Sequence, residues 1–196
     1  WSIYRGIFKL PPAHFIVVRD NDRTLSSPRC YWDLGRIAEQ GAYQPEKDGD
    51  VLTAELEELL KDAVKKRMIA DVPLGTFLSG GLDSTTVTAL MQAQSDKPVR
   101  TFSIGVQSEN IDEAQHATAV ARYLGTDHTE LYATPEEALE VIPQLPMIWD
   151  EPFADSSQIP TFLVSKLARQ HVTVSLSGDG GDELFSGYNR HIVGPG

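Results

Sequence analysis

The sequence predicts an α/β protein whose main part is a doubly wound parallel sheet, preceded by a short β-rich segment. Three observations lead to this class. From about residue 51 onward, short apolar runs alternate with segments of helical periodicity, which is typical of parallel sheets with helices on both faces. Two glycine-rich polar loops directly follow two of these apolar runs. The first 33 residues contain short β-like runs without helical periodicity.

The N-terminal part of the chain divides into a β-rich segment and a linker. Residues 34–50 are polar and contain Gly41, Pro45 and Gly49, so we expect loop structure there. We therefore divide the chain into a β-rich segment (1–33), a linker (34–50) and a main domain (51–196). Within the first segment, the predicted strands are 3–8, 14–19 and 29–32.

The main domain is expected to begin with a helix and to continue as alternating strands and helices. The first helix covers residues 52–69, because apolar residues recur there at three- and four-residue spacing. The predicted strands that follow are 76–78, 99–106, 128–132 and 172–176, and the predicted helices are 85–94, 112–124, 135–142 and 160–170.

Composition limits the classes of function. With 196 residues, 41% hydrophobic and 23% charged, the chain can bury a core, and its apolar runs are too short to span a bilayer. The net charge of -11 argues against a nucleic-acid partner. The single cysteine, Cys30, excludes an internal disulfide and fits a reducing compartment, so we expect a cytoplasmic protein. His116 and His128 lack partners at metal-ligand spacing and are expected on the surface.

The first glycine-rich loop is SGGLDS (79–84), between a predicted strand and a predicted helix. Gly80 and Gly81 allow the backbone to approach a ligand, and the N-terminus of the following helix offers amide groups to an anion. The hydroxyls of Ser79, Ser84 and Thr85 add donors. Alternatively, the glycines form only a tight turn and Asp83 caps the helix.

The second loop is SGDGGDE (177–183), directly after the apolar run VTVSL. Three glycines and three carboxylates in seven residues do not suit a core. The alternative is a flexible acidic turn that caps the next helix. Because ligands bind beyond the carboxyl ends of parallel strands, we expect the two loops to face one ligand.

Neither loop carries the lysine of a nucleoside-triphosphate-binding P-loop, which stabilises the β- and γ-phosphates during γ-phosphoryl transfer. The two loops carry carboxylates instead, those of Asp83, Asp179 and Asp182. Carboxylates repel phosphates unless a divalent cation bridges them, which implies Mg2+. The expected site therefore holds and releases pyrophosphate.

SGGLDS resembles the motif of the ATP-pyrophosphatase (PP-loop) superfamily, whose fold is of the adenine nucleotide alpha hydrolase-like type. Beyond the motif, residues from about 6 to 191 resemble glutamine-hydrolysing asparagine synthetases. GIFKLPPAHFIVV and CYWDL are similar to the last strands of that family's glutaminase domain, so we expect a piece of a longer chain. The stretches similar to the synthetase domain are VPLGTFLSGGLDST, TFSIGV, DEAQHATAVARYLGTDH and SLSGDGGDELFSGY.

The resemblance implies roles for individual residues. Leu78 and Ile104 would contact the adenine and ribose of ATP, although Ile104 could equally be an ordinary core residue. Asp179 would lie beside the activated acyl group, where many members of the family have glutamate. The remaining implied roles are nucleotide contact by Ser177 and Gly178, pyrophosphate binding by Ser79, Gly80, Gly81, Asp83 and Ser84, and Mg2+ binding by Asp83 and Asp182.

The activity that the resemblance implies is an ATP-dependent, AMP-forming amide ligase. It would adenylate a carboxylic acid, expected to be aspartate, and transfer ammonia derived from glutamine by a glutaminase domain. Position 1 is Trp1 where the family's glutaminase has its cysteine, so the 196-residue chain is expected to lack glutaminase activity. A homodimer is the oligomeric state to test for.

The acceptor acid stays open. The stretch WDEPFADSSQIPTF (149–162) is similar to relatives from polysaccharide or secondary-metabolite pathways. The alternatives are another PP-loop ligase, such as a β-lactam-forming enzyme, and a nucleotide-binding module without turnover. Asp150, Glu151, Asp155 and Ser156 either line the acceptor site or belong to a solvated loop.

Overall fold

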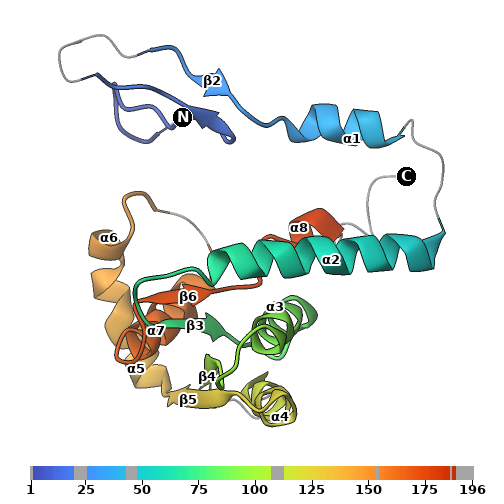
Figure 1. Ribbon diagram of the computed structural model, residues 1–196. Helices are drawn as coiled ribbons and strands as arrows, with labels where there is room; N and C mark the ends of the chain where they lie inside the picture. Colours follow the sequence, from blue (N-terminus) through green and yellow to red (C-terminus); the bar gives the residue numbers. More distant parts are fainter. Residues whose placement is uncertain are drawn as a thin grey trace, which may run out of the picture.

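The computed structural model describes residues 2–19, 26–42, 48–106, 113–152, 155–185 and 187–188. Its centre is a four-stranded, wholly parallel sheet in the order β5-β4-β3-β6 (Figure 1). Helices cover both faces of the sheet, which confirms the predicted α/β class with a parallel sheet. The strands are β3 (Leu74–Phe77), β4 (Arg100–Val106), β5 (Asp127–Ala133) and β6 (Val174–Leu176).

The chain reverses its direction across the sheet at β3. From β3 it passes to β4 and then β5 on one side, and it returns to the other side of β3 to form β6. Phe77 is paired with Phe102 of β4, and Thr76 is paired with Leu176 of β6. A reversal of strand order leaves a crevice beyond the carboxyl ends of the two strands beside it. Both glycine-rich loops begin at these two ends.

The helices form one layer on each side of the sheet (Figure 1). On one side, α2 (Gly49–Arg67) and α3 (Leu82–Ala93) pack with β3 and β6, and α4 (Glu113–Leu124) packs beside them. On the other side lie α5 (Pro135–Val141) and α7 (Gln158–Ala168). The short helices are η1 (Ile142–Gln144) and α6 (Leu145–Ile148), which continue α5, and α8 (Gly181–Phe185), which follows β6.

Alternation along β3 distributes its side chains between the two layers. Leu74 packs with α2 and α3, and Phe77 packs toward α7 on the opposite face. Since successive side chains of a strand point to opposite faces, a strand covered on both sides is apolar throughout. The core therefore consists of separate apolar clusters on each face of one sheet.

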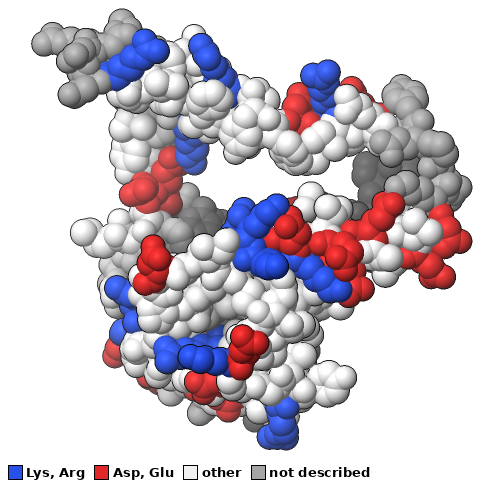
Figure 2. Space-filling view, in the orientation of Figure 1, with Lys and Arg blue, Asp and Glu red and all other residues white. Residues whose placement is uncertain are grey.

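Helix α2 separates its charges along its length. Its first turn contains Asp50, and its last turn contains Lys65, Lys66 and Arg67. Figure 2 shows the acidic atoms toward the N-terminal end of this helix and the basic atoms at its C-terminal end. This distribution complements the helix dipole.

No helix in the described part of the chain is long and apolar enough to cross a membrane.

The N-terminal segment differs from the prediction. In the described part of this segment, the regular β structure is β1 (His14–Phe15) paired antiparallel with β2 (Arg29–Cys30), and residues 3–8 form no strand. The linker was expected to be a loop, but α1 (Leu34–Ala42) occupies most of it. Asp33 Oδ1 accepts a hydrogen bond from Arg36 N (3.2 Å), which is the contact of an N-capping residue.

The predicted elements of the main domain are present, with their ends shifted by a few residues. The helices η1, α6 and α8 were not expected. Gly125 ends α4 with a φ of 72°, as its position after the helical pattern predicted. Trp1, residues 43–47 of the linker and the predicted helix start at 112 lie outside the described residues.

Candidate active site

The two glycine-rich loops meet beyond the carboxyl ends of β3 and β6. Gly178 lies against the main chain of the first loop, since a Cβ at this position would stand 2.6 Å from Ser84 N and 2.9 Å from the carbonyl carbon of Asp83. The Asp83 carboxylate lies against Gly181 in a similarly close contact. The two loops are therefore in contact, whereas their sharing of one ligand stays a prediction. The contact between Asp83 and the 177–183 loop is the centre of the candidate site.

Gly80 brings the first loop against α4. Its φ of 81° lies in the left-handed region that favours glycine. A Cβ at this position would stand 2.8 Å from Ala117 N and 2.9 Å from His116 Cβ. His116 is exposed, as expected, but it lies beside the phosphate-binding loop predicted from the sequence. The sequence did not indicate this proximity, because Gly80 and His116 belong to different strand–helix units.

The hydroxyls of the first loop have different surroundings. Ser84 is buried, and its Oγ accepts from Ser79 N (3.2 Å) and donates to Gly81 O (3.2 Å). The Ser79 and Ser84 hydroxyls are 2.9 Å apart, and Ser79 is exposed. The Thr85 hydroxyl, expected to be a donor to a ligand, is buried and unpaired within the described residues. Ser84 therefore shapes the loop, whereas Ser79 is accessible from outside.

Helix α3 begins without a capping side chain. Its N-cap is Gly81, with φ -71° and ψ 164°, and no side chain accepts a hydrogen bond from the first turn at this cap. Asp83 lies within the first turn, so the alternative that Asp83 is the N-cap is wrong. The first amides of a helix have no acceptor inside it, and at α3 no side chain of the cap takes that place.

The second loop turns sharply into α8. Ser177 Oγ donates to Asp179 Oδ2 (3.0 Å), and Gly180 has a φ of 97°. Asp182 lies in the first turn of α8, and its carboxylate is in close contact with Gly187. An acidic turn at the start of a helix, the alternative interpretation, describes this local structure. Helix capping does not require the contact with Asp83, however.

The two residues expected beside the adenine differ in their packing. Leu78 is 1% exposed and its side chain packs against Ala117 and Ala121 of α4, so its contact with a nucleotide stays a prediction. Ile104 is half-buried and packs toward Leu163 and Val164 of α7. The core role left open for Ile104 is thus observed, and its contact with a nucleotide stays a prediction.

The described residues between α6 and α7 (149–152 and 155–157) lie at the same edge of the sheet as the loops. Ile148 and Ile159, on either side of them, pack in one cluster with Ala133 and Ile104 near the carboxyl ends of β5 and β4. Asp155 is exposed, and its carboxylate accepts a hydrogen bond from Ser157 N (2.8 Å), which lowers its pKa. The position suits an acceptor site, while the exposure suits a solvated loop, so both interpretations stand.

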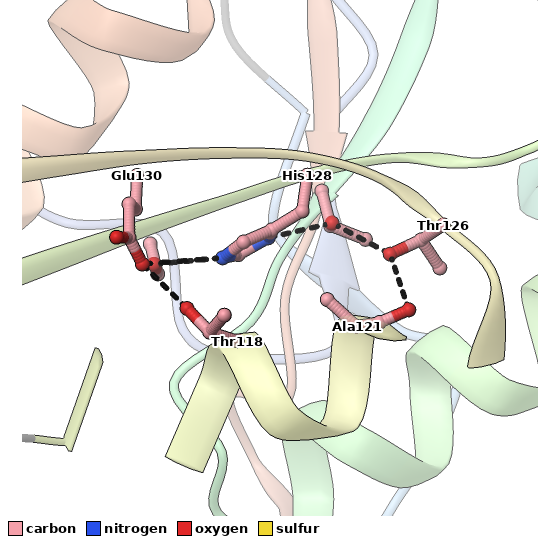
Figure 3. Close-up of polar contacts among 7 residues, drawn as sticks. Thr118, Ala121, Thr126, His128 and Glu130 are labelled. Atoms are coloured by element: carbon pink, nitrogen blue, oxygen red, sulfur yellow. Dashed lines mark hydrogen bonds and ion pairs between the residues drawn. The ribbon is translucent and has the colours of Figure 1, made fainter. Parts of the chain in front are cut away.

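A polar cluster connects β4, β5 and α4 (Figure 3). His128 Nδ1 is 2.8 Å from Thr101 Oγ1, and His128 Nε2 is 3.2 Å from Ser103 Oγ. The Thr118 hydroxyl of α4 donates to Glu130, whose Oε2 lies 4.0 Å from the imidazole. Burial lowers the pKa of His128 below 6.5, and the Glu130 charge opposes this shift. The expectation that His128 is a surface residue is wrong, because α4 covers its side chain.

Comparisons with known proteins identify the relatives of this sequence. Residues 55–193 match the family model for asparagine synthase. The chain is 43% identical over 195 residues to a putative glutamine-hydrolyzing asparagine synthetase 2 of Methanocaldococcus jannaschii, covering 99% of this chain and 36% of the relative. It is 39% identical over 140 residues to glutamine-hydrolyzing asparagine synthetase 1 of Bacillus subtilis, covering 71% and 22%.

A further relative and a solved structure extend the comparison. The chain is 32% identical over 204 residues to glutamine-hydrolyzing asparagine synthetase B of Escherichia coli, covering 95% of this chain and 34% of the relative. The NH3-dependent NAD synthetase of Campylobacter jejuni, in complex with the nitrate ion, overlaps with a TM-score of 0.46 at 16% identity, covering 73% and 62%. The chain thus spans about a third or less of the length of these three curated relatives.

Fold and site together define a doubly wound α/β protein. Two glycine-rich loops that carry carboxylates meet at the point where its strand order reverses. The chain belongs to the asparagine synthase family, whose model matches most of its main domain. The resemblance stated from the motifs is therefore confirmed.

Proposed function

We propose that the chain carries the ATP site of an AMP-forming amide ligase of the asparagine synthetase type. The enzyme would adenylate a carboxylic acid, aspartate in the first instance, and would transfer to it ammonia derived from glutamine. The observation that carries this proposal is the contact of Asp83 with the 177–183 loop at the strand-order reversal. Family membership supports it.

The first loop would hold the pyrophosphate part of ATP. The uncapped start of α3 leaves amide donors for phosphate oxygens, and Gly80 and Gly81 place no side chain between them and a ligand. The exposed Ser79 hydroxyl would add a donor by turning from Ser84 Oγ to a phosphate oxygen. Ser84 would contribute mainly by holding the shape of the loop, because its hydroxyl already bonds to loop atoms.

Asp83 and Asp182 would hold Mg2+ together with the phosphates. Carboxylate oxygens are suitable ligands for this hard cation, and the two residues come from opposite sides of the loop junction. No group of three or more histidine, cysteine or acidic side chains within the described residues could hold a metal by itself. Phosphate oxygens and water would therefore complete the coordination, as is usual for Mg2+. The bound ion would neutralise charge on the departing pyrophosphate.

The rest of the nucleotide would lie across the ends of β3, β4 and β6. The main chain of Leu78 and the side chain of Ile104 would flank the adenine and ribose on one side, with Ser177 and Gly178 on the other. Asp179 would lie beside the acyl group. Its carboxylate is oriented by the hydrogen bond from Ser177 Oγ.

The proposed reaction has two steps. A carboxylate oxygen of the acid attacks the α-phosphorus of ATP, the bond to the bridging oxygen of the β-phosphate breaks, and pyrophosphate leaves. Ammonia then attacks the acyl carbon, loses a proton and displaces AMP. The protein contributes positioning of the reactants and electrostatic stabilisation of the charge that develops.

The acceptor and the assembly belong to the same proposal. A ligase with a different acceptor acid is the second candidate, because the 149–162 stretch is similar to relatives from other pathways. The protein would act in the cytoplasm on small molecules, with a glutaminase domain as the ammonia source and without nucleic acid. Light scattering would show whether it forms a homodimer.

Exchange of labelled pyrophosphate into ATP tests the function. In the full-length protein with aspartate, Asp83→Asn and Asp182→Asn should each abolish magnesium-dependent exchange. The double variant should lose no more than either single one, because the two carboxylates act as a unit. Asp96→Asn is a matched control, since Asp96 is exposed in the turn between α3 and β4. Formation of ADP and orthophosphate without AMP would contradict the proposal.

A further inference from the structure

Among the described residues, a hydrogen bond and an ion pair connect the N-terminal segment to the main domain. The Tyr4 hydroxyl donates a hydrogen bond to the carbonyl oxygen of Asp150 (2.9 Å). Lys9 Nζ lies 3.0 Å from Glu151 Oε2. Figure 2 shows basic and acidic atoms side by side where the two parts of the chain approach each other. Both contacts reach consecutive residues, so they act on one short stretch of the main domain.

That stretch lies at the active-site edge of the sheet. Residues 149–157 connect α6 to α7, and the flanking Ile148 and Ile159 pack near the carboxyl ends of β4 and β5. Asp150 and Glu151 are therefore on the same side of the sheet as the two glycine-rich loops. They are also among the residues that the sequence predicts as candidates for the acceptor site.

The stretch has little support of its own. Within the described residues, the main chain of 150–152 makes no hydrogen bond to other main-chain groups. The residues on either side are anchored, since Trp149 N donates to Leu145 O (2.9 Å) and Ser157 N donates to Asp155 Oδ1 (2.8 Å). Tyr4 and Lys9, from outside the α6–α7 connection, therefore supply contacts to Asp150 and Glu151 where the described main chain supplies none.

We propose that Tyr4 and Lys9 are positioning residues that hold the 150–152 stretch in place for the acceptor acid. The N-terminal segment then takes part in the acceptor side of the site without touching the reacting atoms. This inference rests on the proposed ligase function. Because ATP is held by the loops after β3 and β6, loosening the stretch should weaken use of the acceptor and leave use of ATP unchanged.

The size of the effect follows from the exposure of the groups. The Lys9 side chain is 61% exposed and the Glu151 side chain 24%, and exposed ion pairs are weak. We therefore expect Lys9→Glu to raise KM for the acceptor by about two- to fivefold. Tyr4→Phe removes one neutral hydrogen bond and should raise KM for the acceptor by about two- to tenfold.

The kinetic test uses the full-length protein with aspartate as the acceptor probe and ammonium as the nitrogen source. In assays of AMP formation, Lys9→Glu and Tyr4→Phe should raise KM for aspartate, with KM for ATP within about 1.5-fold of wild type. Lys97→Glu is the matched control, because Lys97 is exposed in the turn between α3 and β4 and undergoes the same change of charge. An unchanged KM for aspartate in both variants would overturn the proposal.

Hydrogen exchange provides a readout that does not depend on turnover. The Trp149 amide, which donates to Leu145 O (2.9 Å), should exchange faster in Lys9→Glu and in Tyr4→Phe than in wild type or Lys97→Glu. The reversed pair, Lys9→Glu with Glu151→Lys, should restore slow exchange, whereas Glu151→Lys alone should not. Failure of the reversed pair to restore it would show that the ion pair does not hold the stretch. If no AMP forms with aspartate while exchange responds as expected, the proposed use of aspartate fails and the positioning contact stands.

Discussion

Replacing Gly178 with alanine tests whether the contact between the two loops is needed for function. A Cβ at this position would stand 2.6 Å from Ser84 N, 2.9 Å from the carbonyl carbon of Asp83 and 3.0 Å from Asp83 Cβ. Two of these atoms belong to the main chain and cannot rotate away. Reaching an ordinary contact of 3.4 Å requires the loops to separate by about 0.8 Å.

This separation predicts both a stability loss and a larger functional loss. Forcing a methyl group into a packed contact costs about 1–3 kcal/mol, which urea denaturation of the chain would measure. A displacement of about 1 Å between catalytic groups costs up to about 100-fold in rate. We therefore expect Gly178→Ala to lower magnesium-dependent pyrophosphate exchange in the full-length protein by at least about tenfold.

Two other glycines serve as comparisons. A Cβ at Gly49 would meet nothing within 4 Å, so Gly49→Ala should keep full exchange and should raise stability by up to about 1 kcal/mol as a better helix former. At Gly181, all three nearest atoms belong to the Asp83 side chain, so Gly181→Ala should lower exchange with a smaller loss of stability. If folded Gly178→Ala exchanges pyrophosphate within about twofold of wild type, the loop contact is not the working site and the reasoning is refuted.

Three further predictions concern the stability of the chain, measured by urea denaturation. Burial lowers the pKa of His128 below 6.5, so the unfolded chain binds a proton more readily than the folded chain, and the free energy of unfolding should fall as the pH drops below 6.5. His128→Gln should weaken this pH dependence. An unchanged pH profile in this variant would contradict the prediction. Thr134→Ala should cost about 1 kcal/mol, since Thr134 and Glu137 form a reciprocal capping box, whereas Thr134→Ser should cost little; equal effects of the two would argue against the cap. Leu78→Ala should cost about 2–5 kcal/mol as a core truncation, and Leu78→Met less than about 1.5 kcal/mol; a loss below about 1 kcal/mol for alanine would mean that Leu78 is not a core residue.

Periodicity predicted the main domain because its elements are regular and amphipathic. The strand that became β4 and the helix that became α4 were each recognised within a few residues of their ends. Helix α1 was missed because Gly41 and the polar residues after it favoured a loop. The available signal was Asp33, which makes an N-cap contact with Arg36 N.

Burial of single residues was the weakest part of the prediction. His128 lies on an edge strand and was expected to be exposed, but α4 covers it and Thr101 and Ser103 bond to its ring. Leu78 was expected to contact the nucleotide, and its side chain is enclosed by Ala117 and Ala121. Each of these outcomes depends on how a helix packs against its sheet, which no motif in the strand records.

The sequence by itself determined the α/β class and the positions of the two glycine-rich, carboxylate-bearing loops, because periodicity, glycine positions and carboxylate spacing are properties of short stretches. The tertiary structure decided that β6 pairs with β3, which brings Gly178 and Gly181 onto Asp83. It also decided that Lys9 and Tyr4 meet the stretch after α6. These contacts join segments far apart in the chain, and they depend on strand order and helix packing, which local patterns do not specify.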